Sequence, residues 1–198
     1  MKWVDFSEKL LRMNLPVFTL REALKVSGLK YNTGRMQITR WVRMQHLARL
    51  KNGLYALRGP LDRGEIPAFY IANRLYTPSY VSLESALNYY DLIPEQTFAV
   101  ISLCSKPTRK YIVMQTSYVF RSVQPRFLTG YVVEKEMGFD IRIAEREKAV
   151  VDYLYFTIID KTVPLERLDV KGLDHRKMYR YASLLKEERL VPLIRRLC

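Results

Sequence analysis

Apolar side chains near the start of the chain recur at the spacing of a helix. Trp3, Phe6, Leu10 and Met13 stand three or four residues apart, which predicts an amphipathic helix with one buried face. Pro16 follows and cannot continue a helix, so we expect the helix to end before it. The first element is therefore predicted to be a surface helix that packs on a core.

Two more helices are predicted downstream. The run Thr19-Leu20-Arg21-Glu22 is a capping box, in which the Thr hydroxyl and the Glu carboxylate satisfy backbone N–H groups at a helix start. Gly28 predicts the end of this helix, because glycine readily takes the left-handed conformation. The segment Asn32–Gln45 repeats its apolar residues at helical spacing. Its buried stripe is expected to consist of Gly34, Ile38, Trp41 and Val42.

The opposite face of the segment Asn32–Gln45 is polar and basic. At 100° per residue this face holds Asn32, Thr33, Met36, Arg40 and Arg43, with Arg35, Gln37 and Thr39 on its flanks. Asn, Gln and Arg are the side chains that pair with base edges in the major groove of DNA. The pattern fits a recognition helix, and it also fits the solvated face of an ordinary core helix.

A hairpin is predicted directly after this helix. Asn52-Gly53 favours a two-residue type I′ turn, which would pair Leu50 with Tyr55 and Ala48 with Leu57. Arg49 and Lys51 would then point outward. Helix, turn, helix and basic hairpin follow one another as they do in a winged helix-turn-helix DNA-binding domain.

Beyond residue 59 the pattern changes to a mixture of strands and helices. Residues 60–67 combine Gly and Pro with returning acidic residues, which predicts a linker between a domain at 1–59 and a second domain at 68–198. The fold class is predicted as α+β. Helices are expected over Phe69–Leu75, after a cap at Ser82, over Glu145–Phe156, near Leu165, over Arg176–Leu185 and over Glu188–Leu197. Strands are expected over Phe98–Leu103, Tyr111–Met114, Tyr118–Val123, Tyr131–Glu134 and Phe139–Ile143.

The charge of the chain is concentrated in the predicted first domain. The chain has 198 residues and a formal net charge of +13. Residues 1–59 hold 12 Lys and Arg against three acidic residues, whereas the remainder holds 21 against 17. No Asp or Glu lies between Ala23 and Leu61. Such a stretch suits a polyanion, and the residues expected to contact DNA are Lys30, Asn32, Thr33, Arg35, Met36, Gln37, Arg40, Arg43, Arg49, Lys51 and Asn52.

The remaining composition favours a cytoplasmic protein. Cys104 and Cys198 show neither a disulfide framework nor metal-ligand spacing. The first residues are too polar for a signal-peptide core, and no apolar run is long enough to span a membrane. We therefore expect no membrane partner and a reducing compartment.

Charged residues of the second domain raise the alternative of a metal-dependent nuclease. The set is Glu84, Asp140, Arg142, Glu145, Glu147, Lys148 and Asp152. Such an enzyme needs an acidic residue and a Lys on one strand, but the nearest pair here is Asp140 and Arg142, and Arg does not deprotonate as Lys can. His46 and His175 lack neighbouring ligands at zinc spacing. We expect no catalytic residue, metal or cofactor; a ligand-sensing transcription factor is a third alternative.

The chain resembles the AbiEi-type antitoxins of type IV toxin-antitoxin and phage-defence systems. The resemblance covers most of the sequence and is carried by Phe18–Ala23, Ile38–Val42, Leu50–Leu57, Phe69–Leu75, Pro78–Leu87 and Ile143–Asp152. It implies an N-terminal winged helix that binds repeats in the protein's own promoter. It also implies a C-terminal domain that counteracts a co-encoded nucleotidyltransferase-like toxin, typically without a tight complex. The resemblance thus predicts a transcriptional autorepressor and antitoxin.

Overall fold

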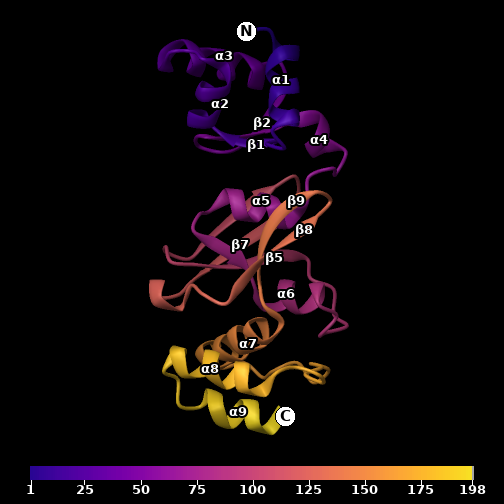
Figure 1. Ribbon diagram of the computed structural model, residues 1–198, viewed down its shortest axis with the longest axis vertical. Helices are drawn as coiled ribbons and strands as arrows, with labels where there is room; N and C mark the ends of the chain where they lie inside the picture. Colours follow the sequence, from indigo (N-terminus) through magenta and orange to yellow (C-terminus); the bar gives the residue numbers. More distant parts are fainter. Residues whose placement is uncertain (198) are drawn as a thin grey trace. The chain divides into compact units, whose positions relative to one another are not determined.

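The computed structural model describes residues 1–197 and has a mixed α+β fold (Figure 1). Its contacts divide the chain into two compact units. Unit 1 contains Met1–Leu75 together with Lys135–Phe139. Unit 2 contains Tyr76–Glu134 and the chain from Asp140 onward. None of the helices in the described part is long and apolar enough to cross a membrane.

Unit 1 combines helices with a small antiparallel sheet. In chain order the elements are α1 (Trp3–Arg12), β1 (Val17–Thr19), α2 (Leu20–Ser27), α3 (Tyr31–Arg43), β2 (Leu47–Lys51), β3 (Leu54–Leu57), α4 (Arg58–Asp62) and α5 (Ala68–Leu75). The strand order is β1-β3-β2, so β3 is the central strand and pairs with both neighbours.

Local sequence signals explain where the helices of unit 1 begin and end. Thr19 and Glu22 form the predicted capping box, and Gly28 ends α2 with a φ of 68°. The segment predicted from Asn32 forms α3, which begins one residue earlier. Met13 departs from its predicted place on the buried face: it lies just after α1 and is 60% exposed.

The core of unit 1 lies between α1, α3 and the sheet. Phe6 stacks on Trp41 with a centroid distance of 4.6 Å and meets Phe18 edge-on at 5.7 Å. Ile38 and Trp41 are each 3% exposed, as the predicted stripe requires, and Val42 is half-buried against the same cluster. Burial of this aromatic stripe fixes which face of α3 remains open to solvent.

The hairpin between β2 and β3 forms, but its predicted register is wrong. Arg49 pairs with Tyr55 and Ala48 with Ala56, and the register shifts between Arg49 and Lys51. Among the described residues, Gly53 has a positive φ of 76° and Asn52 does not, so the turn is not of type I′. Leu50 is left without a partner between Arg49 and Lys51, and one extra residue on a strand of an antiparallel pair is a β-bulge.

The segment expected to be a linker is partly folded into unit 1. It contains most of α4, and Leu61 and Ile66 are 8% and 5% exposed. The boundary between the compact units falls after Leu75. The Gly and Pro residues in this segment therefore mark a change of chain direction within a folded unit, because the apolar residues between them are buried.

The larger sheet has the strand order β6-β7-β5-β4-β9-β8. Its strands are β4 (Ser79–Val81), β5 (Ala99–Cys104), β6 (Arg109–Val113), β7 (Thr116–Ser122), β8 (Tyr131–Glu136) and β9 (Phe139–Ala144). Five of them match the predicted strands to within two residues at each end. β4 was not predicted, although it pairs with β5 and with β9 at the centre of the sheet.

Helices of unit 2 pack around α7. They are α6 (Leu83–Tyr89), α7 (Arg146–Asp160), α8 (His175–Leu185) and α9 (Leu190–Leu197), with a short 3-10 turn at Pro125–Phe127. The helix predicted near Leu165 does not form, so that prediction is wrong. Lys161 ends α7 with a φ of 55°, and the N–H of Leu165 donates to the Tyr153 hydroxyl instead of to a helical carbonyl.

Candidate nucleic-acid interface

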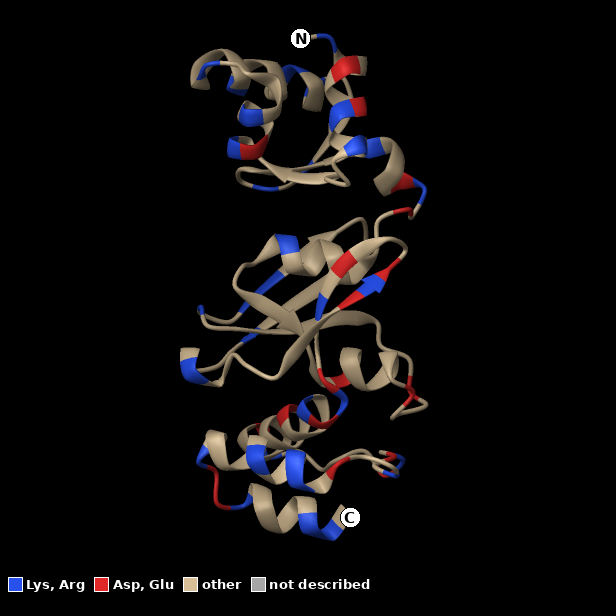
Figure 2. Ribbon diagram, in the orientation of Figure 1, with Lys and Arg blue, Asp and Glu red and all other residues tan. Residues whose placement is uncertain are grey.

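The exposed face of α3 gathers most of the predicted DNA-contacting residues on one surface. An open depression of about 920 Å³ runs along the helix and is lined by Asn32, Thr33, Arg35, Met36, Gln37, Thr39, Arg40 and Arg43. All of these side chains are exposed except that of Gln37, which is half-buried. Figure 2 shows Lys and Arg along α3 with no acidic residue among them. We call this surface the α3 face.

The α3 face is held rigidly from behind. Ile38 and Trp41 are buried in the core of unit 1, and α3 contacts both α2 and β2. Gly34 permits the close approach of α2, because an added Cβ there would lie 2.1 Å from a methyl carbon of Leu24. The Thr39 hydroxyl donates to the Arg35 carbonyl at 2.9 Å. An anchored helix with a polar outer face can present its side chains without rearranging.

Positive charge on the α3 face is not neutralised within the structure. Within residues 1–197, the side chains of Lys30, Arg35, Arg40 and Arg43 have no carboxylate within ion-pair distance. Most acidic groups of the same unit are engaged elsewhere: Glu22 pairs with Arg74. Unpaired cations of this kind keep their charge available for an anionic ligand.

The start of α3 adds to this positive surface. Lys30 occupies the N-cap position without a side-chain capping bond, and the first turn contains no acidic residue. Backbone N–H groups and the helix dipole therefore leave partial positive charge at this end. Tyr31, which the sequence reasoning missed, is 58% exposed here. An aromatic residue at the first helical position, outside the predicted buried stripe, is the sequence feature that could have indicated it.

Residues at the hairpin turn lie apart from the α3 lining. Arg49 is exposed and its guanidinium donates to the side-chain oxygen of Asn52. This bond fixes the direction of Arg49 and occupies one acceptor that Asn52 would offer to a base. The hairpin thus presents one oriented guanidinium and an exposed Asn52 whose side-chain oxygen already accepts a hydrogen bond, whereas Lys51 is half-buried.

The capping box joins the α2 side of unit 1 to α5. Burial raises the pKa of Glu22, but hydrogen bonds from Arg74 and Thr19 outweigh it, so the pKa lies below its ordinary value. The Glu22 carboxylate also accepts the backbone N–H of Thr19 at 2.6 Å. A single carboxylate therefore caps the helix that precedes α3 and links it to Arg74.

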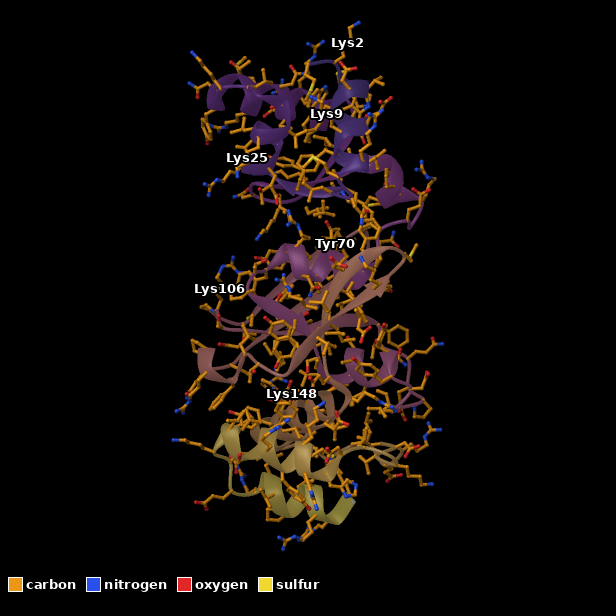
Figure 3. All side chains as sticks on the ribbon, viewed as in Figure 1. Lys2, Lys9, Lys25, Tyr70, Lys106 and Lys148 are labelled. Atoms are coloured by element: carbon orange, nitrogen blue, oxygen red, sulfur yellow. The ribbon has the colours of Figure 1, made fainter. Side chains whose placement is uncertain are left out.

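The charged residues considered for a nuclease do not form one site. Lys148, which is labelled in Figure 3, lies one turn from Asp152 on α7. The two side chains are each 1% exposed and form an ion pair in the interior of unit 2. The Asp152 carboxylate accepts the Ser82 hydroxyl at 2.8 Å and the Tyr80 hydroxyl at 3.1 Å. Ser82 takes the predicted N-cap position of α6, but its hydroxyl is used for this contact.

Burial dominates the chemistry of this buried cluster. Desolvation raises the pKa of Asp152 above its ordinary value, and Lys148 with the two hydroxyls opposes that rise. Burial likewise raises the pKa of Tyr80. Groups that solvent does not reach cannot bind a substrate in this conformation. The sequence signal for this cluster was a Lys and an Asp four residues apart within an otherwise apolar helix.

Two other members of that set, Glu145 and Glu147, lie at the start of α7 and share Lys177 as an ion-pair partner. Glu145 at the N-cap of α7 pairs with Lys177 and accepts the Tyr181 hydroxyl at 2.7 Å. Burial raises the pKa of Glu145, but the contacts with Lys177 and Tyr181 lower it by more. The pKa of Glu145 therefore lies below its ordinary value. Glu84 is half-buried at the start of α6. Within residues 1–197 no three His, Cys, Asp or Glu side chains are grouped to hold a metal ion.

Comparison with known proteins adds no assignment to this geometry. No family model matches the chain and no curated protein matches it. The case for the α3 face therefore depends on its own residues.

Proposed function

We propose that unit 1 is a winged helix-turn-helix and that the protein is a DNA-binding transcriptional autorepressor. The observation that carries the proposal is the α3 face, which is exposed, carboxylate-free and lined by Arg, Gln, Asn and Thr on a helix anchored by its opposite side. These are the side chains that read base edges and grip phosphates.

The order of elements in unit 1 supports this proposal. A helix, a short strand, two helices and a β-hairpin follow one another from α1 to β3, and β1 completes a three-stranded sheet. In a winged helix-turn-helix the second of the paired helices enters the major groove and the hairpin forms the wing. In this assignment α3 reads the bases, while Arg49 and Lys51 of the hairpin contact the backbone.

For the whole chain we propose the role of antitoxin in a type IV toxin-antitoxin pair. The support is the resemblance to the AbiEi-type antitoxins, which covers both units. In this role the protein acts in the cytoplasm and counteracts a nucleotidyltransferase-like toxin, without requiring a direct complex. A gene for such a toxin next to this one, and restored growth when both are expressed, would be the expected findings.

The nuclease alternative has weaker support. Among the charged residues considered for a nuclease, Lys148 and Asp152 form an ion pair, but both side chains are buried. If the carboxylates of this set have structural roles only, Glu84→Gln and Asp140→Asn should leave DNA binding unchanged. Specific Mg²⁺-dependent cleavage by the unmodified protein that either change abolishes would contradict the proposed role.

Salt dependence of DNA binding tests the proposal directly. The protein should bind its own upstream region, and about six to eight phosphate contacts would give a slope of log K against log[salt] of about −5 to −7. Fluorescence anisotropy with a labelled duplex at a series of salt concentrations measures the slope. An unrelated duplex of the same length serves as the control. Binding that ignores salt, or that does not distinguish the two duplexes, would contradict the proposal.

A further inference from the structure

Met36 is an exposed apolar side chain in the middle of the polar α3 face, and 74% of it is open to solvent. The other exposed methionines of residues 1–197 lie outside helices and strands, at the chain start, at helix ends or in turns. They are Met1, Met13, Met44, Met114 and Met137. Within this part of the chain, Met36 is thus the exposed methionine that lies inside an element. Neither a chain end nor a turn accounts for its exposure.

Met36 lies opposite the buried stripe of α3. At 100° per residue, Ile38 and Trp41 point about 160° and 140° away from it, and both are buried. Asn32 and Arg40 lie one turn before and one turn after Met36, within about 40° of its direction. Met36 is therefore the outermost point of the α3 face. In a major groove about 12 Å wide, the outermost side chain of a helix comes closest to the base pairs.

Thr39 enlarges the apolar centre of the face. It is exposed and lies three residues after Met36, on the same side of the helix. Its hydroxyl donates to the Arg35 carbonyl at 2.9 Å, so its hydrogen is already used within α3. The methyl group of Thr39 is then available to a ligand beside the Met36 side chain.

The cations around this apolar centre restrict what can cover it. Arg40 and Arg43 are exposed and have no carboxylate within ion-pair distance in residues 1–197. An apolar partner would leave these charges without counterparts, and a polar anion would leave Met36 uncovered. The major groove of DNA offers both kinds of contact, with phosphates along its edges and the C5-methyl group of thymine on its floor. RNA is disfavoured, because uracil lacks this methyl group and side chains do not reach into the narrow major groove of A-form RNA.

We propose that Met36 reads the C5-methyl group of a thymine in the operator, with the Thr39 methyl group beside it. This inference rests on the proposed DNA-binding function and adds the base that α3 requires opposite Met36. Hydrogen bonds from the polar residues of the α3 face cannot distinguish thymine from uracil, because the two bases differ only in the methyl group. Burial of one methyl group corresponds to a gain in affinity of about threefold to fivefold.

Removal of thymine methyl groups tests the proposal with the full chain. The probe is a labelled duplex of the protein's own upstream region, in which each thymine in turn is replaced by deoxyuracil. In fluorescence anisotropy, at least one replacement should weaken binding by about threefold to fivefold. Met36→Ala should weaken binding to the unmodified duplex by a similar factor and should show no further loss with deoxyuracil at that position. Met36→Leu retains an apolar side chain and should remain sensitive to deoxyuracil.

A second base separates the methyl group from the other groups of thymine. At the same position, 5-methylcytosine should bind the unmodified protein more tightly than cytosine does, and Met36→Ala should not distinguish the two. Met13→Ala is the matched control, because Met13 is an exposed methionine of unit 1 that lies outside α3, and it should behave as the unmodified chain does. Thermal melting checks that the variants are folded.

The outcomes separate this inference from the proposed function. Salt-dependent binding of the upstream duplex that no deoxyuracil replacement weakens would overturn the reading by Met36 and leave DNA binding intact. A deoxyuracil effect of the same size in Met36→Ala as in the unmodified protein would also overturn it. Absence of any preference for the upstream duplex would overturn both.

Discussion

Lys148 and Asp152 form a buried ion pair whose energetic role depends on both partners being present. Each charge loses its hydration in the interior of unit 2, and their attraction with the Tyr80 and Ser82 hydroxyl groups compensates for that loss. Removal of one partner leaves a buried charge without its counterpart. Replacement of both by apolar residues avoids that cost.

We therefore expect Lys148→Met to lower the free energy of unfolding by about 3–5 kcal/mol. The combination of Lys148→Met with Asp152→Leu should lose clearly less than Lys148→Met alone. Urea unfolding followed by circular dichroism gives both values. If Lys148→Met does not fold, the double variant still tests the idea, since it must then be the more stable of the two. A loss below about 1 kcal/mol for Lys148→Met would show that the pair is not isolated from water.

Glu22 makes the stability of unit 1 sensitive to acid. Its pKa is lower in the folded chain than in the unfolded chain, so the ionised carboxylate stabilises the fold above its ordinary pKa of 4.5. That contribution is lost as the pH falls from this value through the lower pKa of the folded state. Glu22→Gln should cost about 1 kcal/mol at neutral pH, since the charged contact with Arg74 and part of the cap are lost.

The difference between the unmodified chain and Glu22→Gln should shrink as the pH falls below 4.5. Unfolding curves followed by tryptophan fluorescence at neutral and acidic pH measure it. Glu8→Gln is the control, because Glu8 meets Arg12 at the surface and such pairs contribute less than about 1 kcal/mol. A difference that does not change with pH would mean that the charge of Glu22 is unimportant.

At the scale of elements, substitutions on α3 and on the hairpin should change DNA binding in different ways. Arg40→Ala or Gln37→Ala should cost about 1–3 kcal/mol of DNA binding and relax the preference at particular operator positions. Lys51→Ala should weaken binding to all sequences and reduce the salt slope by about one, because it removes a phosphate contact. Anisotropy titrations against a panel of operator point variants separate these outcomes.

Lys171→Ala, an exposed change in unit 2, serves as the control for these titrations and should alter neither quantity. Melting curves must show that all variants are folded, which is expected because none of these side chains lies in the core. If the Arg40 and Gln37 variants discriminate among the operator variants as well as the unmodified protein does, α3 is not the element that reads the bases.

Elements with a strong local signal were predictable from the sequence, and those that depend on distant residues were not. The capping box at Thr19 and the buried stripe around Trp41 were sufficient to place α2 and α3 and the outer face of α3. β4 has only three residues and follows Pro78, so its pairing with two distant strands leaves no local pattern. The hairpin register depended on one unpaired residue, which the turn dipeptide alone does not reveal.

At the scale of the whole molecule, unit 1 is completed by residues from far along the chain. The Asn14 side chain donates to the Gly138 carbonyl at 2.8 Å, and the Tyr70 ring lies 4.8 Å from the Phe139 ring. These contacts join positions separated by more than sixty residues, and no periodicity in the sequence could have indicated them. A boundary drawn from composition therefore omits part of the unit.

A fragment that ends at Leu75 should accordingly be less stable than unit 1 in the full chain. It lacks the hydrogen bond to Gly138 and the ring contact with Phe139, which together are expected to contribute about 2 kcal/mol. Urea unfolding of both proteins gives the comparison, and Asn14→Ala in the full chain should reproduce about half of the loss. Identical midpoints for the fragment and the full chain would show that residues 135–139 add nothing.

Both tryptophans of the chain, Trp3 and Trp41, lie in unit 1, with ring centroids 5.3 Å apart. Tryptophan fluorescence therefore reports on unit 1 alone. Unit 2 contains tyrosines but no tryptophan among its described residues, so it does not contribute when only indole is excited. In the same sample, the buried Cys104 thiol of unit 2 becomes open to alkylation only when the larger sheet opens. An experimenter can thus follow the melting of each half separately, with no dye or inserted probe, and can learn whether they come apart together.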